Sequence, residues 1–184
     1  AMFTIPGGER VVIFRLVALR GSSETSLSIS ISVQVVCNPP WFFANPPADI
    51  GCPTAAALGV PGTFQTFERG FMFRIQLPGV DKVCGIQNDR NRYACYNYAA
   101  YTGTPPATPP TGFQGPAVEL QDAFYNQLAI GGFWYTIIGW GTTAPIPTTY
   151  SVQYDTTGRI YISTPLGAYR FDGALTSGDV RRLP

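Results

Sequence analysis

The stretch Ser26-Leu27-Ser28-Ile29-Ser30-Ile31-Ser32-Val33-Gln34-Val35 alternates polar and apolar residues without interruption. Because successive side chains of a β-strand point to opposite faces, this pattern predicts a strand with one buried and one solvated face. Upstream, Val11–Leu19 is rich in β-branched and other apolar residues, which favour a second strand. Gly21–Glu24 lies between the two and has the composition of a four-residue turn. The sequence therefore predicts a β-hairpin.

The length of this turn fixes the predicted pairing. If Arg20 lies opposite Thr25, apolar residues of the two strands face one another, in the pairs Ala18–Leu27, Leu16–Ile29, Phe14–Ile31 and Val12–Val33. On the other face Ile13, Val17 and Leu19 lie opposite serines, so the first strand is apolar on both sides. A lone hairpin is marginally stable in water, and this one is expected to need more than one partner surface.

The composition predicts the fold class. The chain has 184 residues, of which 20 are glycine and 17 are proline, and 14% are aromatic. This balance favours strands and turns over helices. We therefore expect an all-β protein, mainly antiparallel and sandwich-like or barrel-like. One short helix is predicted near residues 116–128, where proline occupies the first turn and Phe124 and Leu128 are spaced for one face.

Four segments are expected along the chain. Two Pro-Pro pairs after Val36 indicate a boundary, because proline cannot lie inside a central strand, and the Thr/Pro-rich run 102–112 predicts an extended linker. The predicted segments are an N-terminal arm and hairpin (1–36), a disulfide-stapled β-module (37–101), the linker (102–112) and a C-terminal β-module (113–184). Beyond the hairpin we predict a helical turn at 54–58 and strands at 63–67, 71–77, 133–140, 148–154, 159–163 and 167–171, with a turn at 155–158.

Four cysteines allow three disulfide connectivities. Cys84 and Cys95 lie symmetrically about Asn88–Asn91, so a hairpin centred between Asp89 and Arg90 places them directly opposite each other, near disulfide distance. Cys37 and Cys52 then pair by elimination. The alternative is free or metal-bound thiols, which the absence of histidine and of any C-x-x-C spacing disfavours. Disulfides predict an oxidising compartment, and hence a secreted or cell-surface protein.

Net charge and hydropathy argue against nucleic-acid binding and against a membrane-spanning helix. The net charge is +1, and Lys82 is the sole lysine, so no basic patch for nucleic acid is expected. The longest apolar run, Leu128–Gly141, is interrupted by glycines and is shorter than the about 20 residues of a membrane-spanning helix. We therefore expect neither nucleic-acid binding nor a membrane span.

Catalysis is not expected either. Without histidine, a Ser-His-Asp or Cys-His centre cannot form, and histidine-ligated metal sites are excluded. Glu68 and Glu119 could form a glycosidase pair. The simpler interpretation is that Glu68 pairs with Arg69 or Arg74 and that Glu119 stabilises a helix start. The sequence therefore predicts no catalytic residue, no metal ligand and no cofactor.

Two stretches resemble known bacterial proteins. Val11–Val36 resembles the last two strands of a bacterial immunoglobulin-like domain. Cys52-Pro53 followed by Gln65-Thr66-Phe67-Glu68-Arg69-Gly70-Phe71-Met72 resembles the CP…QxFERGxM motif of secreted surface modules in filamentous bacteria. In that family, the second half of the module carries the pattern seen here in Gly158–Ile162 and Leu166–Tyr169. The resemblance implies location and architecture and transfers no site residue.

The N-terminal segment leads to the predicted function. Ala1–Ile5 is a short apolar lead, separated from the hairpin by Pro6–Gly8. It is either a frayed terminus or a strand donated to a neighbour, since an exposed hairpin edge is a template for an added strand. With the hairpin, the second interpretation predicts a non-enzymatic extracellular structural protein that self-assembles into a surface filament or layer. The predicted interface residues are Met2, Phe3, Ile5, Val11, Ile13, Val17 and Leu19.

The alternative function is a carbohydrate-binding or adhesive cell-surface module. Trp41, Trp134 and Trp140 could offer flat faces to sugar rings. Because these residues lie within apolar runs, we favour roles for them in the core or at interfaces. The expected partners are other copies of the chain, with polysaccharide as the alternative.

Overall fold

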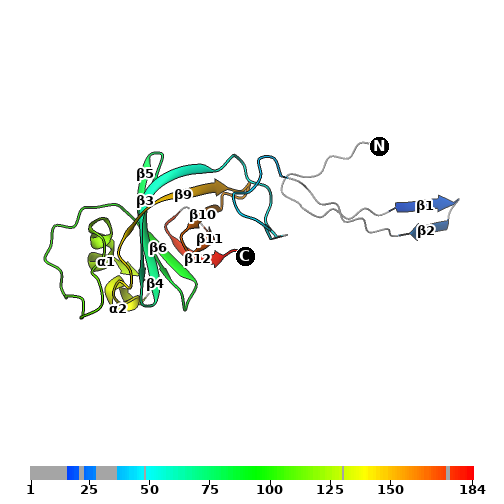
Figure 1. Cartoon of the computed structure of the whole chain (residues 1–184). Helices are drawn as coiled ribbons and strands as arrows, with labels where there is room; N and C mark the ends of the chain where they lie inside the picture. The colour runs from blue at the N-terminus through cyan, green and yellow to red at the C-terminus, as the bar shows by residue number, and fades with distance from the viewer. Residues whose placement is uncertain (1–15, 21–22, 28–36, 48, 130, 173–174) are drawn as a thin grey trace.

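The computed structural model describes residues 16–20, 23–27, 37–47, 49–129, 131–172 and 175–184. Antiparallel strands are the main regular structure among these residues, which confirms the predicted fold class, and eight of the strands close into a barrel (Figure 1). Around the barrel the strand order is β10-β11-β12-β6-β5-β4-β3-β9. The bounds are β3 Leu58–Phe67, β4 Gly70–Leu77, β5 Val80–Gln87, β6 Arg92–Asn97, β9 Ile146–Tyr154, β10 Ile160–Thr164, β11 Gly167–Phe171 and β12 Ser177–Arg182.

The structure differs from the predicted division of the chain at residues 102–112. Strands β3–β6 precede this segment and β9–β12 follow it, yet β3 pairs with β9 and β6 pairs with β12. Residues 37–101 and 113–184 are therefore parts of one barrel rather than two modules. The physical reason is that closure pairs the outer edges of the two halves, which would otherwise stay exposed.

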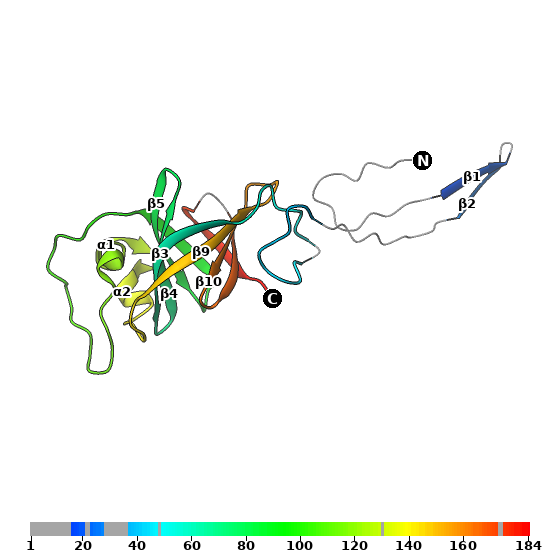
Figure 2. The ribbon, with the colours of Figure 1, turned by 45° about the horizontal axis from the view of Figure 1, so that its top comes forward.

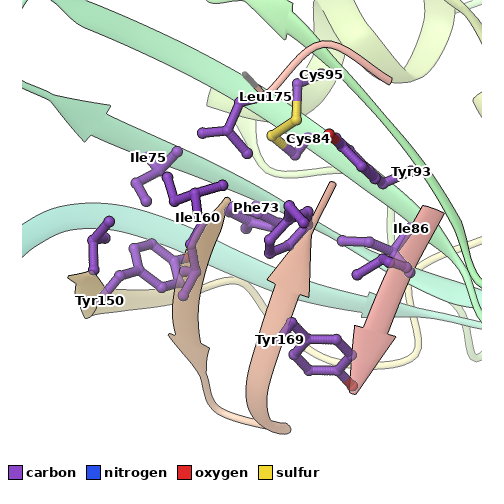
Figure 3. Packing of buried hydrophobic residues seen from close by; sticks show 14 of the residues in the cluster. Phe73, Ile75, Cys84, Ile86, Tyr93, Cys95, Tyr150, Ile160, Tyr169 and Leu175 are labelled. Carbon is purple, nitrogen blue, oxygen red and sulfur yellow. A yellow bond between two sulfur atoms is a disulfide. The ribbon is translucent and has the colours of Figure 1, made fainter. Parts of the chain in front are cut away.

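The barrel interior is filled by side chains that alternate along the strands (Figure 3). Phe71, Phe73 and Ile75 of β4 are completely buried inside, whereas Arg74 between them points outward and pairs with Asp81. The disulfide Cys84–Cys95 joins opposed residues of β5 and β6 within this interior cluster, as predicted from the turn between them. The second predicted disulfide, Cys37–Cys52, is also confirmed. An eight-stranded barrel of this kind has a packed core rather than a channel.

Short helices cover one outer face of the barrel (Figure 2). The 3₁₀ helix η1 (Val118–Leu120) and the helix α1 (Gln121–Asn126) lie within the predicted range 116–128. The predicted strand 133–140 is wrong, because α2 (Trp134–Ile137) occupies it after the two-residue strands β7 (Leu128–Ala129) and β8 (Gly132–Phe133). The helical turn places the Trp134 ring against Gly85 of β5, and the ring is buried there.

A cystine loop covers another outer face. Trp41, Phe43 and Ile50 of this loop pack on Tyr161, which points outward from β10. No helical turn forms at 54–58, whose residues lead directly into β3. The polar tail after Phe171 contains the strand β12, which the sequence did not predict. Val180 is the single inward apolar residue of this strand, so the segment shows no recognisable alternation.

The N-terminal hairpin consists of β1 (Leu16–Arg20) and β2 (Ser23–Leu27). Arg20 lies opposite Ser23 rather than Thr25, so the predicted register is wrong by two residues. The pairing leaves only Gly21 and Ser22 between the strands, which matches the two-residue connections that hairpins favour. An even shift keeps the same residues on each face. The rest of the predicted alternating strand, 28–35, lies outside the described residues.

We predict that Gly85→Ala destabilises the barrel by about 1 to 3 kcal/mol, because an added methyl group overpacks a filled site. A Cβ at Gly85 would lie 2.7 Å from the buried Trp134 ring. Chemical denaturation followed by tryptophan fluorescence measures the change. Gly59→Ala in β3 is the matched control, since its Cβ would meet only a Thr149 methyl at 3.6 Å. Equal stabilities of the two variants would contradict this account of the Trp134 site.

Candidate functional site

The hairpin β1–β2 carries the described part of the predicted assembly interface. Val17 lies opposite Ser26, and Leu19 lies opposite Glu24. In an antiparallel ladder closed by two residues, the flanking pair is hydrogen-bonded and the next pair is not. The backbone groups of Val17 and Leu19 therefore point away from β2. The remaining predicted interface residues, Met2, Phe3, Ile5, Val11 and Ile13, lie outside the described residues.

This hairpin is a separate sheet. Within the described part of the chain, β1 and β2 pair only with each other, and both views of the molecule draw them away from the barrel (Figures 1 and 2). The eight barrel strands all have neighbours on both sides. Of the described strands, only those of this hairpin and of the much shorter β7–β8 ribbon keep an unpaired edge. The outer edges of β1 and β2 are thus the longest unpaired edges among the described strands, and the edge of β1 is the one that carries the predicted interface residues Val17 and Leu19.

The tryptophans do not form a sugar-stacking platform. Trp41 and Trp134 are buried, and their indole N–H groups donate to the Gly51 carbonyl and the Tyr96 hydroxyl, both at 3.0 Å. Trp140 is partly buried against Phe124, with the ring centroids 5.8 Å apart. The burial of Trp41 and Trp134 agrees with the favoured packing role rather than with the sugar-stacking alternative, because both rings complete the packing of loops and helices against the barrel.

Gln65, the first residue of the QxFERGxM stretch, joins the barrel to the helical cover. Its side chain points outward from β3 yet is completely buried. The amide nitrogen donates to the carbonyls of Gly115 and Thr143, both at 3.0 Å, and the amide oxygen accepts from the Ala117 N–H at 2.8 Å. One side chain thus satisfies three backbone groups on two segments that are distant in sequence.

Glu68 and Arg69 form the next contact of the same stretch with that cover. Glu68 Oε2 accepts from the Trp140 N–H at 2.8 Å. Arg69 donates through Nε to the Ile137 carbonyl at 2.6 Å and through Nη2 to the Thr136 carbonyl at 3.1 Å. The otherwise unpaired carbonyls at the end of α2 are thereby satisfied. Phe67 and Met72 pack in the same apolar cluster as α1 and α2, so this stretch has a structural role here.

The predicted pairing of Glu68 with Arg69 or Arg74 is wrong, because no ion pair of Glu68 occurs among the described residues. Arg74 makes a two-pronged ion pair with Asp81, with Nε–Oδ1 at 3.0 Å and Nη2–Oδ2 at 2.6 Å. The hydrogen bond to Asp81 raises the pKa of Arg74, and a weaker attraction from Glu119 acts in the same direction. Glu119 lies in the first turn of η1, as the simpler interpretation predicted. Among the described residues, no three His, Cys, Asp or Glu side chains form a group able to hold a metal ion.

A second buried glutamine joins the cystine loop to the barrel. Gln153 of β9 donates to the carbonyls of Pro40 and Ala55 and accepts from the Phe42 N–H at 2.8 Å. Two residues later, Asp155 closes the turn between β9 and β10. Its Oδ1 accepts from the N–H groups of Thr157 and Arg159 and from the Thr157 hydroxyl, and its Oδ2 accepts from the Tyr161 hydroxyl at 2.9 Å.

A cavity of about 260 Å³ opens at one end of the barrel. It lies between the β5–β6 turn, the β10–β11 turn and the end of β12, and is lined by Ile86, Asn88, Asn91, Leu166, Tyr169, Val180 and Arg182. The sequence carries no signal for this site, because its residues come from three separate parts of the chain. The helices that the structure describes are all too short to cross a membrane.

Comparison with protein families, curated proteins and solved structures gives no match for this chain. The resemblance to bacterial surface modules therefore stays a prediction, and function must be argued from the chain itself.

We predict that Gln65→Leu destabilises the protein by at least about 1 to 3 kcal/mol, because it leaves buried backbone groups unpaired. Hydrogen exchange at the Ala117 amide should accelerate more than exchange in β4, since the helical cover loosens first. Gln114→Leu, at an exposed position beside the same segment, is the control. Unchanged protection of Ala117 in the Gln65 variant would contradict the assigned role.

The Asp155 carboxylate predicts a pH dependence of stability. Burial acts to raise the pKa of Asp155, but hydrogen bonds from Thr157, Arg159 and Tyr161 outweigh it and hold the pKa below 3.8. A lowered pKa in the folded state means that this stabilisation is complete above about pH 4 and is lost as the pH falls through the folded value.

Asp155→Asn should therefore cost about 1 to 3 kcal/mol at pH 7, and the difference from the parent should shrink below about pH 4. Urea denaturation at pH 7, 5 and 3 measures it. Asp179→Asn, which changes a carboxylate with 70% of its side chain exposed, is the control. A difference that stays constant down to pH 3 would show that Asp155 does not act through its charge.

Proposed function

We propose that this chain is a non-enzymatic extracellular structural protein that self-assembles by adding a strand of one copy to the N-terminal hairpin of another. The observation that carries the proposal is the outer edge of the hairpin strand β1, which no other described strand pairs with, whereas each of the eight barrel strands has a neighbour on both sides. Added strands gain backbone hydrogen bonds at such an edge, which is a recurring mode of association.

The barrel suits the role of a rigid structural unit. Its interior is packed with aromatic side chains, and two disulfides restrict the chain within it and beside it. Disulfides are typical of proteins that work outside the reducing cytosol, which supports an extracellular location. A two-stranded ribbon alone is marginally stable, so pairing with a further strand would stabilise the hairpin as well as join two copies.

The alternative, a carbohydrate-binding or adhesive module, has less support. Its predicted platform needed exposed indole rings, and two of the three are buried. We therefore place self-assembly first.

Val17→Pro tests the proposed edge without breaking the hairpin. Proline removes an outward-pointing N–H at this position, and proline is tolerated on strand edges. We expect assembly to weaken by about tenfold or more, because a hydrogen bond of the added strand is lost and the proline ring obstructs its approach. Sedimentation velocity and negative-stain microscopy at matched protein concentration measure assembly.

Ser26→Pro is the matched control for this experiment. Ser26 lies opposite Val17, and its backbone groups point to the outer edge of β2 instead. This variant should assemble like the parent if strands add at β1. Normal assembly of the Val17 variant, or a parent that stays monomeric at every concentration, would reject the proposed mode.

A further inference from the structure

The cavity at the barrel end has an apolar floor and a polar rim. Ile86, Tyr169 and Val180 belong to the interior cluster and form the floor, with the Tyr169 ring centroid 5.2 Å from that of Phe71. Asn88 and Asn91 stand on the rim, where both residues are exposed at the β5–β6 turn. Pockets that bind small molecules commonly combine such an apolar surface with a few polar groups, and barrel mouths are frequent places for them.

The charge at this rim comes from Arg182. It is two residues beyond the inward-facing Val180, so alternation along β12 places it over the barrel mouth. Its guanidinium lies beside Gly167, where an added Cβ would be 3.4 Å from Nε. Burial raises the pKa of the Tyr169 hydroxyl, and the positive charge of Arg182 opposes that rise, which is consistent with the two side chains sharing the cavity.

Arg182 differs from the arginines near it. Arg181 points to the opposite side of β12 and makes an ion pair with Asp49 at 2.9 Å. Arg170 contacts Asp49 and Asp172, and Arg159 contacts Asp172. Among the residues that the structure describes, no carboxylate lies within ion-pair distance of Arg182. The cavity therefore presents a guanidinium whose charge has no partner within the described chain.

We propose that this cavity binds a small monocarboxylate that also carries hydroxyl groups, of the size of one uronic acid ring. A guanidinium fork matches a carboxylate in shape and charge. The side-chain amides of Asn88 and Asn91 can both donate to and accept from hydroxyl groups. Ile86, Leu166 and Val180 offer apolar contact to the C–H face of the ring. The volume of about 260 Å³ lies below the range for drug-sized ligands, which fits a single ring.

This site is independent of the proposed self-assembly, since it uses none of the hairpin residues. The experiment titrates the full chain with galacturonate and, separately, with galactose, which has the same ring and carries CH₂OH in place of the carboxylate. Two-dimensional amide NMR spectra report the binding. We expect saturable shifts for galacturonate with a Kd of about 1 mM, centred on Asn88, Asn91 and Tyr169, and at least about tenfold weaker binding of galactose.

Two variants test whether Arg182 supplies the positive charge that binds galacturonate. Arg182→Gln should weaken galacturonate binding by about tenfold or more, whereas the neighbouring Arg181→Gln should leave it within about twofold. Arg182 is exposed, so its variant should keep the parent spectrum outside the cavity. The proposal is overturned if galacturonate gives no saturable shift up to about 50 mM, if galactose binds equally well, if the shifts map elsewhere, or if the two variants behave alike.

Discussion

Closure of the barrel is the constraint on which the rest of the structure depends. The pairings β3–β9 and β6–β12 join strands that lie far apart in the sequence and leave none of the eight with a free edge. The enclosed space must be filled, and large aromatic side chains together with the Cys84–Cys95 disulfide fill it. Closure also turns every second residue outward. Wherever those residues are apolar, the outside of the barrel needs a cover.

Two buried glutamines show how these covers are attached. Gln65 and Gln153 both point outward, and each satisfies three backbone groups on covering segments that lie outside the barrel strands. A glutamine suits this position because it donates and accepts at once, and a buried backbone group left unpaired is costly. The residues from Gln65 to Met72 therefore serve to position the helical cover.

Local signals in the sequence predicted local structure well. The symmetric spacing of Cys84 and Cys95 about one turn fixed both a register and a disulfide, and alternation identified most barrel strands. The strand predicted at 133–140 was wrong because a short apolar run has no period that separates a strand from a buried helix. The single barrel and the cavity at its end depend on pairings between distant strands, for which one sequence carries no readable signal. The register of the N-terminal hairpin depends on the number of residues in its turn, and the composition of the turn alone did not determine that number.

The two proposals follow from opposite properties of the same architecture. Pairing is complete in the barrel, so its backbone offers no strand edge to another copy, and its end can offer a ligand only side chains such as Arg182 and Asn88. The hairpin is the reverse case, because its outer edge offers backbone groups that are independent of side-chain identity. Strand addition at β1 would then set the spacing between copies while each barrel mouth stays open. Under these two proposals, the protein would join to itself and bind a small ligand without either event altering the barrel core.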